Sequence, residues 1–135
     1  MFTQVFSKEN FNKINSMHDS IATNISIKDK TLIIEYDNLE YEQSPNCKYK
    51  KLTIEYIIDS YCDAKLYKKN FYKYIDLLEN NKLFNKLTRN CSFRSFKYAI
   101  DSFNELTLFF YIQGKNKYWN FEINTDATQI TYNWE

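Results

Sequence analysis

The residues best equipped for chemistry are His18, Asp19 and Ser20, because His18 is the only histidine of the chain. A catalytic histidine needs a nucleophile on one side of its ring and an orienting carboxylate on the other. At the end of a helix the side chain of Asp19 points roughly 100° away from that of His18, and Ser20 is no better placed. We therefore expect His18 to be structural and the chain to be non-enzymatic, with no catalytic residues.

Acidic residues form three pairs that have the composition needed for glycoside hydrolysis, a reaction that requires two carboxyl groups at a fixed separation in a cleft. The pairs are Glu35 with Asp37, Asp59 with Asp63, and Asp101 with Glu105. Acidic residues that alternate with apolar ones along a strand are typical of a sheet face in contact with water. We interpret all three pairs as surface residues.

Metal and cofactor sites have no recognisable motif in this sequence. The three cysteines, Cys47, Cys62 and Cys91, are widely spaced and form no CxxC pair, whereas structural zinc sites use closely spaced ligands. The single glycine, Gly114, excludes the glycine-rich loops that bind phosphates and dinucleotides. We expect no metal, no cofactor and reduced thiols, as in a cytoplasmic protein.

A basic and aromatic run extends from Lys65 to Tyr74 and contains four lysines and no acidic residue. Lysines neutralise phosphates and tyrosine rings stack on bases, so the run is a candidate nucleic-acid surface. The opposing interpretation is a helix whose rings face the core while its lysines face water. The net charge of +1 gives no overall field that attracts nucleic acid, which favours this second interpretation.

Aromatic side chains beyond those needed for a core are the strongest indication of a binding surface. Phe109, Tyr111 and Tyr118 lie opposite the alternating apolar residues of the C-terminal strands, while Tyr67 and Tyr72 in the basic run are candidates for exposure. Tyrosine is favoured at protein interfaces because one flat side chain supplies both contact area and a hydrogen bond. We predict that these five residues bind a protein partner.

Two helices are predicted to flank the strands that carry these residues. Ser7 can cap an N-terminal helix, and apolar residues at helical spacing follow it as far as His18. Apolar residues at positions i, i+3, i+4 and i+7 predict a central helix over residues 71–78. A second short helix is possible around Leu83 to Leu87.

Alternating apolar residues predict a sheet over the rest of the chain. We expect a hairpin from Ile21 to Tyr36, a strand from Leu52 to Leu66 with a turn or bulge near residues 59–60, and a C-terminal meander with a turn at residues 124–127. Strands joined by short turns pair antiparallel. The expected fold class is α+β, with one curved, mainly antiparallel sheet of six to eight strands on which the N-terminal and central helices pack.

The composition fits one soluble domain over residues 1–135. Hydrophobic residues make up 44% of the chain and aromatic residues 19%, which is enough for one core. No stretch has the roughly 20 apolar residues that span a bilayer, and the first residues lack the features of a signal peptide. We therefore expect no membrane partner.

Residues 11–37 resemble small bacterial families in which a helix ends in His-Asp-Ser and runs directly into a β-hairpin. The pattern stands here as Met17-His18-Asp19-Ser20-Ile21, followed by Ile25, Ile27, Leu32 and Ile34. Several such families resemble immunity proteins of polymorphic toxin systems, which neutralise a toxin by binding it. The resemblance implies an α+β fold, a cytoplasmic location and no enzymatic activity.

Together these observations favour a non-enzymatic bacterial protein-binding domain, in its most concrete form an immunity protein that neutralises a partner toxin by steric occlusion. Two alternatives remain open. One is a domain that encloses a small apolar ligand between sheet and helix. The other is a nucleic-acid binder that uses the run from Lys65 to Tyr74.

Overall fold

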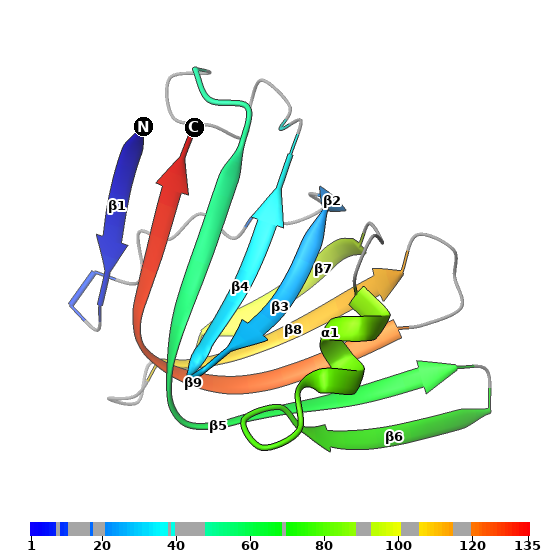
Figure 1. Ribbon diagram of the computed structural model, residues 1–135. Coiled ribbons are helices and arrows are strands. Elements are labelled where there is room, and N and C mark those ends of the chain that lie inside the picture. The colour runs from blue at the N-terminus through cyan, green and yellow to red at the C-terminus, as the bar shows by residue number, and fades with distance from the viewer. Residues whose placement is uncertain are drawn as a thin grey trace.

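The computed structural model consists of a single antiparallel sheet and one short helix (Figure 1). It describes residues 1–7, 9–10, 17, 21–37, 39, 48–68, 70–88, 93–100, 106–114 and 120–135. Within these residues, nine strands and one helix are present: β1 (Phe2–Phe6), β2 (Ile21–Ala22), β3 (Asn24–Lys28), β4 (Thr31–Tyr36), β5 (Leu52–Lys68), β6 (Phe71–Asp76), α1 (Lys82–Thr88), β7 (Phe93–Ile100), β8 (Leu106–Gly114) and β9 (Asn120–Trp134).

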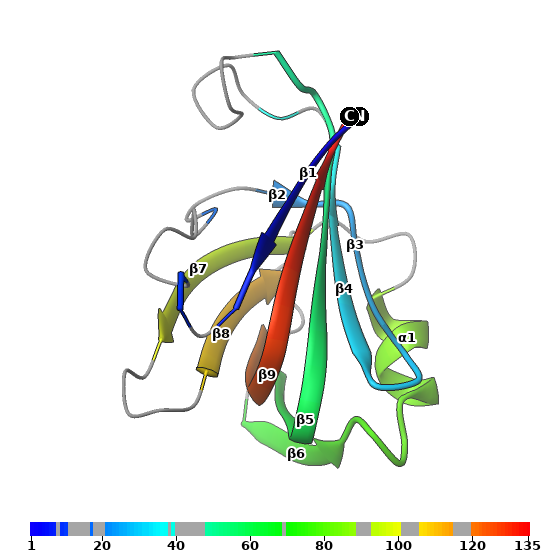
Figure 2. The ribbon, with the colours of Figure 1, turned by 90° about the vertical axis from the view of Figure 1, so that its left-hand side faces the viewer.

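Two long strands, β5 with 17 residues and β9 with 15, organise the sheet. They pair with each other along nearly their whole length and bend together, so that each contributes to two layers (Figure 2). In one layer β4 and β3 extend from the first half of β5, and β1 extends from the last half of β9. In the other layer β6 pairs with the last half of β5, and β8, β7 and β2 extend from the first half of β9.

The bend of the long strands is fixed by a buried carboxylate. The pairing of β5 with β9 shifts register between Ile57 and Cys62, which marks a β-bulge, and bulges sharpen the local bend of a strand. Asp126 Oδ1 accepts hydrogen bonds from the backbone N–H groups of Ser60 (2.8 Å) and Tyr61 (3.1 Å), and its other oxygen accepts one from the Ser60 hydroxyl. The carboxylate therefore satisfies the donors that the bulge removes from the ladder.

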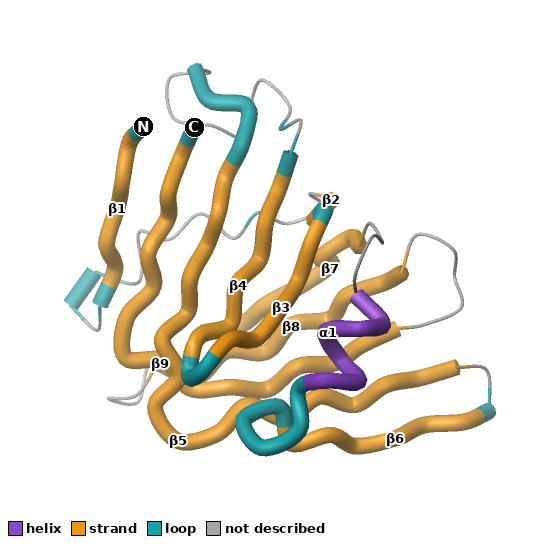
Figure 3. The backbone as a smooth tube through the Cα atoms, in the orientation of Figure 1, coloured by secondary structure: helices purple, strands orange, loops and turns teal. Residues whose placement is uncertain are grey.

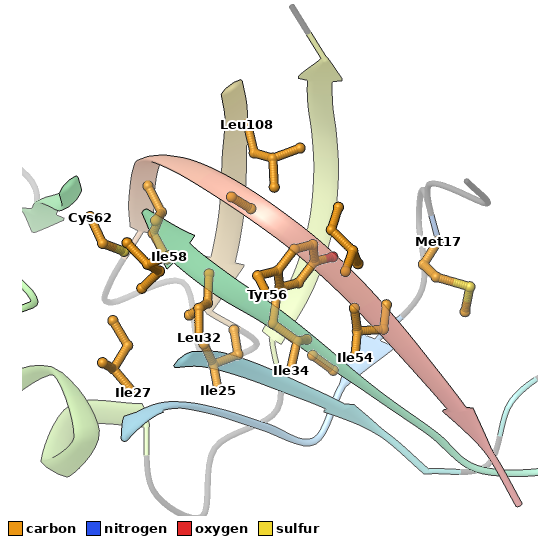
Figure 4. Packing of buried hydrophobic residues seen from close by; sticks show 14 of the residues in the cluster. Met17, Ile25, Ile27, Leu32, Ile34, Ile54, Tyr56, Ile58, Cys62 and Leu108 are labelled. Atoms are coloured by element: carbon orange, nitrogen blue, oxygen red, sulfur yellow. The ribbon is translucent and has the colours of Figure 1, made fainter. Parts of the chain in front are cut away.

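The core lies between the two layers and is filled by alternate residues of the long strands and their neighbours. On β5, the inward side chains are Leu52, Ile54, Tyr56, Ile58, Cys62, Ala64 and Leu66, all of them buried. Figure 4 shows Leu32 and Ile34 of β4 beside Ile54 and Tyr56 of β5, with Leu108 of β8 in the same cluster. The predicted alternation and bulge in this strand are confirmed.

The two ends of the sheet meet at Thr23. This residue alone separates β2, which pairs with β7, from β3, which pairs with β4. Its N–H donates to the Glu35 carbonyl oxygen over 2.7 Å. The chain thus passes from one layer to the other at this point, and β2 and β3, the two ends of the strand path, are joined by a single residue.

The short helix α1 covers the outer edge of β3. The side-chain amide of Asn85 accepts a hydrogen bond from Ile27 N–H (2.9 Å) and donates one to the Ile27 carbonyl oxygen (2.9 Å). Phe84 on the same helix is fully buried and contacts the Phe121 ring edge to face, with centroids 5.6 Å apart. Asn85 therefore takes the place of a further strand beside β3.

The predicted α+β class is wrong, because strand predominates throughout the described residues (Figure 3). The first element is strand β1 and not an N-terminal helix, although residues 11–16 and 18–20 lie outside the described part. The predicted central helix over 71–78 is strand β6. The sheet has nine strands where six to eight were expected. The short helix near Leu83 is confirmed as α1.

The central helix was predicted wrongly because its apolar spacing is ambiguous over so few residues. Phe71, Tyr74 and Ile75 match a helical face, yet Phe71–Asp76 is also rich in aromatic and β-branched residues that favour strands. The last half of β5 offers an open edge, and only residues 69 and 70 separate it from β6. Hairpin pairing on that edge, which also buries Ile75, outweighs the helical pattern.

Candidate functional site

The outer face of the β5–β6 hairpin carries a group of four side chains, Lys65, Tyr67, Tyr72 and Tyr74, which we term the tyrosine–lysine cluster. Lys65 is directly opposite Tyr74 and Tyr67 is directly opposite Tyr72. Residues opposite each other in an antiparallel pair lie on the same face. Because the intervening residues Ala64, Leu66 and Ile75 are buried in the core, period-2 alternation directs all four cluster residues outward.

The ammonium group of Lys65 lies at the centre of the cluster. Its Nζ is 4.7 Å from the ring centroids of both Tyr67 and Tyr72 and 5.4 Å from that of Tyr74. These distances fall within the range of cation–π attraction. Hydrogen bonds to the hydroxyl groups of Tyr67 and Tyr74 outweigh the partial loss of solvation and raise the pKa of Lys65. The lysine therefore remains charged, with its ammonium group next to all three rings.

The rings remain accessible although they pack around the Lys65 ammonium group. The side chain of Tyr72 is 58% exposed and that of Tyr74 is 65% exposed, and their rings meet edge to face with centroids 5.8 Å apart. Phe71, at the tip of the hairpin on the opposite face, is 58% exposed. Large aromatic side chains that are both ordered and exposed lose little entropy on contact with a partner, which suits a binding surface.

Acidic side chains lie on two sides of the cluster. Asp63 is directly opposite Asp76 at the far end of the hairpin, and burial together with the charge of Asp76 raises the pKa of Asp63. Glu122 of β9 is directly opposite Lys65 on its other side. Among the described side chains of β5, β6 and β9 around the cluster, three carboxylates therefore accompany one lysine.

The lysines of the basic run do not form one surface. Lys68 and Lys73 alternate with Tyr67, Tyr72 and Tyr74, so they occupy the opposite face of the hairpin from Lys65. Lys69 lies outside the described residues. The lysines that are neighbours in the sequence are therefore divided between the two faces of the hairpin. A helical interpretation of the run does not predict this division.

Of the five residues predicted to bind a partner, two belong to the tyrosine–lysine cluster, two lie on β8 in the same layer, and one lies outside the described residues. Tyr67 and Tyr72 are opposite each other in the tyrosine–lysine cluster. The backbone of Tyr111 on β8 is opposite Glu122, and that of Phe109 is opposite Asn124, which places both positions on the strand that follows β9 across the same sheet. Tyr118 lies outside the described residues.

Sequence reasoning missed Tyr74 and the central place of Lys65. Tyr74 was assigned to the buried face of a helix, although it is the most exposed ring of the cluster. The signal that identifies it is the period-2 pattern of Tyr72 and Tyr74 after a short turn, read with Lys65 and Tyr67 before that turn.

The other residues considered for chemistry show no assembled site in the described part. His18, Asp101 and Glu105 lie outside it, and Glu35 accepts a hydrogen bond from the Asn24 side chain (2.6 Å). Cys62 is a free thiol, and its burial raises its pKa to about 12, so it is a poor nucleophile. No group of three or more Cys, His, Asp or Glu side chains that could hold a metal ion occurs among the described residues.

In the part of the chain that is described, no helix is long and apolar enough to cross a bilayer. Comparisons of the chain with protein-family models, with curated proteins and with solved structures gave no match.

Proposed function

We propose that the chain is a non-enzymatic protein-binding domain that contacts its partner through the tyrosine–lysine cluster. The observation that carries the proposal is the pair of exposed rings, Tyr72 and Tyr74, ordered around Lys65 on a face that the core does not need. Exposed aromatic side chains that adopt one arrangement before binding are typical hot-spot residues of protein interfaces. Steric occlusion by this face would be the mechanism of action.

Charge favours a protein over a nucleic acid as the partner. The exposed rings are suited to base stacking, which supports a nucleic-acid binder as a second candidate. However, Asp63, Asp76 and Glu122 accompany Lys65 on the same face, and phosphates avoid carboxylates. Nucleic-acid binding would also fall steeply with salt, because it depends on counterion release. Binding that is insensitive to salt would therefore favour the protein partner.

The most concrete form of the proposal is an immunity protein whose partner is a bacterial toxin. The resemblance of residues 11–37 to immunity-type families is the ground for naming this partner, although the α+β fold that it implied is not the fold of the described residues. A cytoplasmic location belongs to the same expectation. The buried free thiol of Cys62 is compatible with a reducing compartment. That the partner is a toxin stays a prediction, which a growth assay tests.

The direct test compares partner capture by three forms of the protein. The double variant Tyr72→Ser, Tyr74→Ser removes both exposed rings, and the matched control Val5→Ser changes a side chain that is 52% exposed on the distant strand β1. We expect the parent and Val5→Ser to capture the same partner from the native organism and the double variant to lose it. A partner retained equally by a folded double variant would contradict the proposal.

Co-expression with the product of the neighbouring gene tests the toxin hypothesis separately. Growth should be restored by the parent chain and by Val5→Ser, and not by the double variant. Unchanged lethality in the presence of the parent chain would exclude that gene product as the partner.

A further inference from the structure

Among the described strands, β6 has one edge that pairs with no other strand, and the hydrogen-bonding groups on this edge can be identified. Leu77 N–H donates to the Cys62 carbonyl oxygen over 2.8 Å, and Leu77 follows Asp76, which is opposite Asp63. Bonded and non-bonded pairs alternate along an antiparallel ladder. The odd-numbered residues of β6 therefore bond to β5, and Tyr72, Tyr74 and Asp76 direct their N–H and C=O groups away from the sheet.

The outward backbone groups of β6 lack the side-chain partner that those of β3 have. At β3 the outward groups of Ile27 are paired with the Asn85 side chain. Along β6 the one outward backbone group that is hydrogen-bonded among the described residues is the Asp76 carbonyl oxygen, which accepts from Asn80 N–H (2.9 Å). No described strand pairs with β6 on this side. An uncovered strand edge of this kind is a template for pairing with another strand.

We propose that two copies of this chain pair antiparallel through β6, with the twofold axis at Tyr74. In a twofold pairing through β6, each residue and its opposite in the second copy must lie on the same face of the sheet. This condition holds only if the twofold axis passes between one residue and the same residue of the second copy. Centring on Lys73 would place the two lysines directly opposite each other in a closely spaced, non-bonded pair, where like charges are destabilising. Centring on Tyr74 avoids this contact and keeps residues 72–76 within the paired strand.

The register centred on Tyr74 provides hydrogen-bonding partners for the outward backbone groups of β6. The N–H and C=O of Tyr74 bond to those of Tyr74 in the second copy, and Asp76 N–H bonds to the second copy's Tyr72 carbonyl oxygen. The second copy's Tyr72 N–H shares the Asp76 carbonyl oxygen with Asn80 N–H. Opposite residues share a face, so Tyr72 of the second copy lies beside Asp76, which faces the like-charged Asp63 in its own chain. A phenol hydroxyl thereby becomes available as a donor to this carboxylate pair.

Pairing through the edge leaves the outer face accessible. It would place two tyrosine–lysine clusters side by side across the axis. The inference goes beyond the proposed function and does not depend on it, because oligomeric mass and partner capture are measured separately.

Sedimentation analysis of the full chain tests the pairing. We expect a concentration-dependent species of twice the monomer mass of 16.4 kDa. The variant Tyr74→Pro lacks both the outward N–H and the ring, and an outward-facing N–H is one that an edge strand can lose without breaking its inner ladder. It should be monomeric, whereas Val5→Ser should dimerise as the parent does. A parent chain that is monomeric at all concentrations, or a Tyr74→Pro variant that dimerises equally, would overturn the proposal.

Disulfide trapping tests the register even if Tyr74→Pro does not fold. In a background without the native cysteines, Tyr74→Cys should form a covalent dimer on mild oxidation. Opposite residues of a bonded pair have Cα atoms about 5.5 Å apart, within the span of a disulfide. Lys73→Cys serves as the control for the alternative register. Cross-linking of Lys73→Cys with none at Tyr74→Cys would refute the axis proposed here.

Discussion

Replacement of Asn85 by alanine tests whether one side chain protects the edge of β3. The substitution removes two hydrogen bonds of 2.9 Å to the backbone of Ile27. A hydrogen bond contributes about 1 kcal/mol net, and a part-buried group left without a partner costs more. Alanine favours the helix over asparagine by up to about 0.7 kcal/mol, which offsets part of the loss. We expect the free energy of unfolding to fall by roughly 2 kcal/mol.

Chemical denaturation of Asn85→Ala measures this loss, and Lys86→Ala on the exposed side of the same helix is the matched control. The control should change stability by less than about 0.5 kcal/mol, as surface substitutions usually do. Amide hydrogen exchange gives a local measurement, since Ile27 N–H should lose protection in Asn85→Ala. The N–H of Ser26, which faces β4, should retain it.

An Asn85→Ala variant as stable as the parent, with Ile27 N–H still protected, would refute the reasoning. It would mean that the amide pairing contributes nothing beyond what water provides at that edge. The role of α1 would then reduce to the burial of Phe84 against Phe121.

Three further predictions concern titratable groups. Asp63→Asn should stabilise the protein at pH 7 by about 0.2–1 kcal/mol, because the substitution removes the repulsion between the opposite carboxylates of Asp63 and Asp76. Burial and the charge of Asp76 raise the pKa of Asp63. The gain in stability should therefore vanish as the pH falls through that pKa, because the parent carboxyl group is then protonated. Burial alone would raise the pKa of Asp126, but hydrogen bonds from Ser60 and from Tyr61 N–H outweigh it and lower the pKa. The stability that Asp126 contributes should therefore be present above about pH 4 and be lost as the pH falls through the lowered pKa of the folded state. Asp126→Ala should reduce the free energy of unfolding by about 2 kcal/mol or more at pH 7. Acid and urea titrations of both proteins would measure these effects. Because burial raises the pKa of Cys62 to about 12, iodoacetamide should label this thiol only on unfolding, which mass spectrometry would detect in a variant without the other cysteines.

Local alternation in the sequence predicted the strands that are buried on one face. In β5, buried apolar residues alternate with other residues from Leu52 to Leu66 on both sides of the bulge. In the β3–β4 hairpin, Asp29 lies in the turn with a φ of 55°. Such patterns are local because a strand repeats every two residues. The predicted break at 124–127 is instead a bend within one continuous strand, β9, because Thr125 and Asp126 are held by residues more than sixty positions away.

The wrongly predicted elements depend on partners distant in sequence. β1 forms on the last half of β9, where Trp134 Nε1 donates to Gln4 Oε1 (2.8 Å) across 130 positions. Its five residues carry no decisive local pattern. β6 depends on the open edge of β5, and the tyrosine–lysine cluster exists only once that pairing forms. The candidate site was therefore divided in the sequence between two residues predicted as exposed, Tyr67 and Tyr72, and one predicted as buried, Tyr74.

The composition of the hairpin is hard to explain by stability alone. Cross-strand aromatic pairs such as Tyr67–Tyr72 contribute about 0.2–1 kcal/mol, and threonine or valine provides similar strand propensity. On the other layer, the outward positions of β3 and β4 carry polar or aliphatic side chains, such as Ser26, Thr31 and Ile33, and no aromatic ring. Two tyrosines that remain more than half exposed bury little apolar area in the folded chain. Their rings gain that burial only when a second molecule covers them.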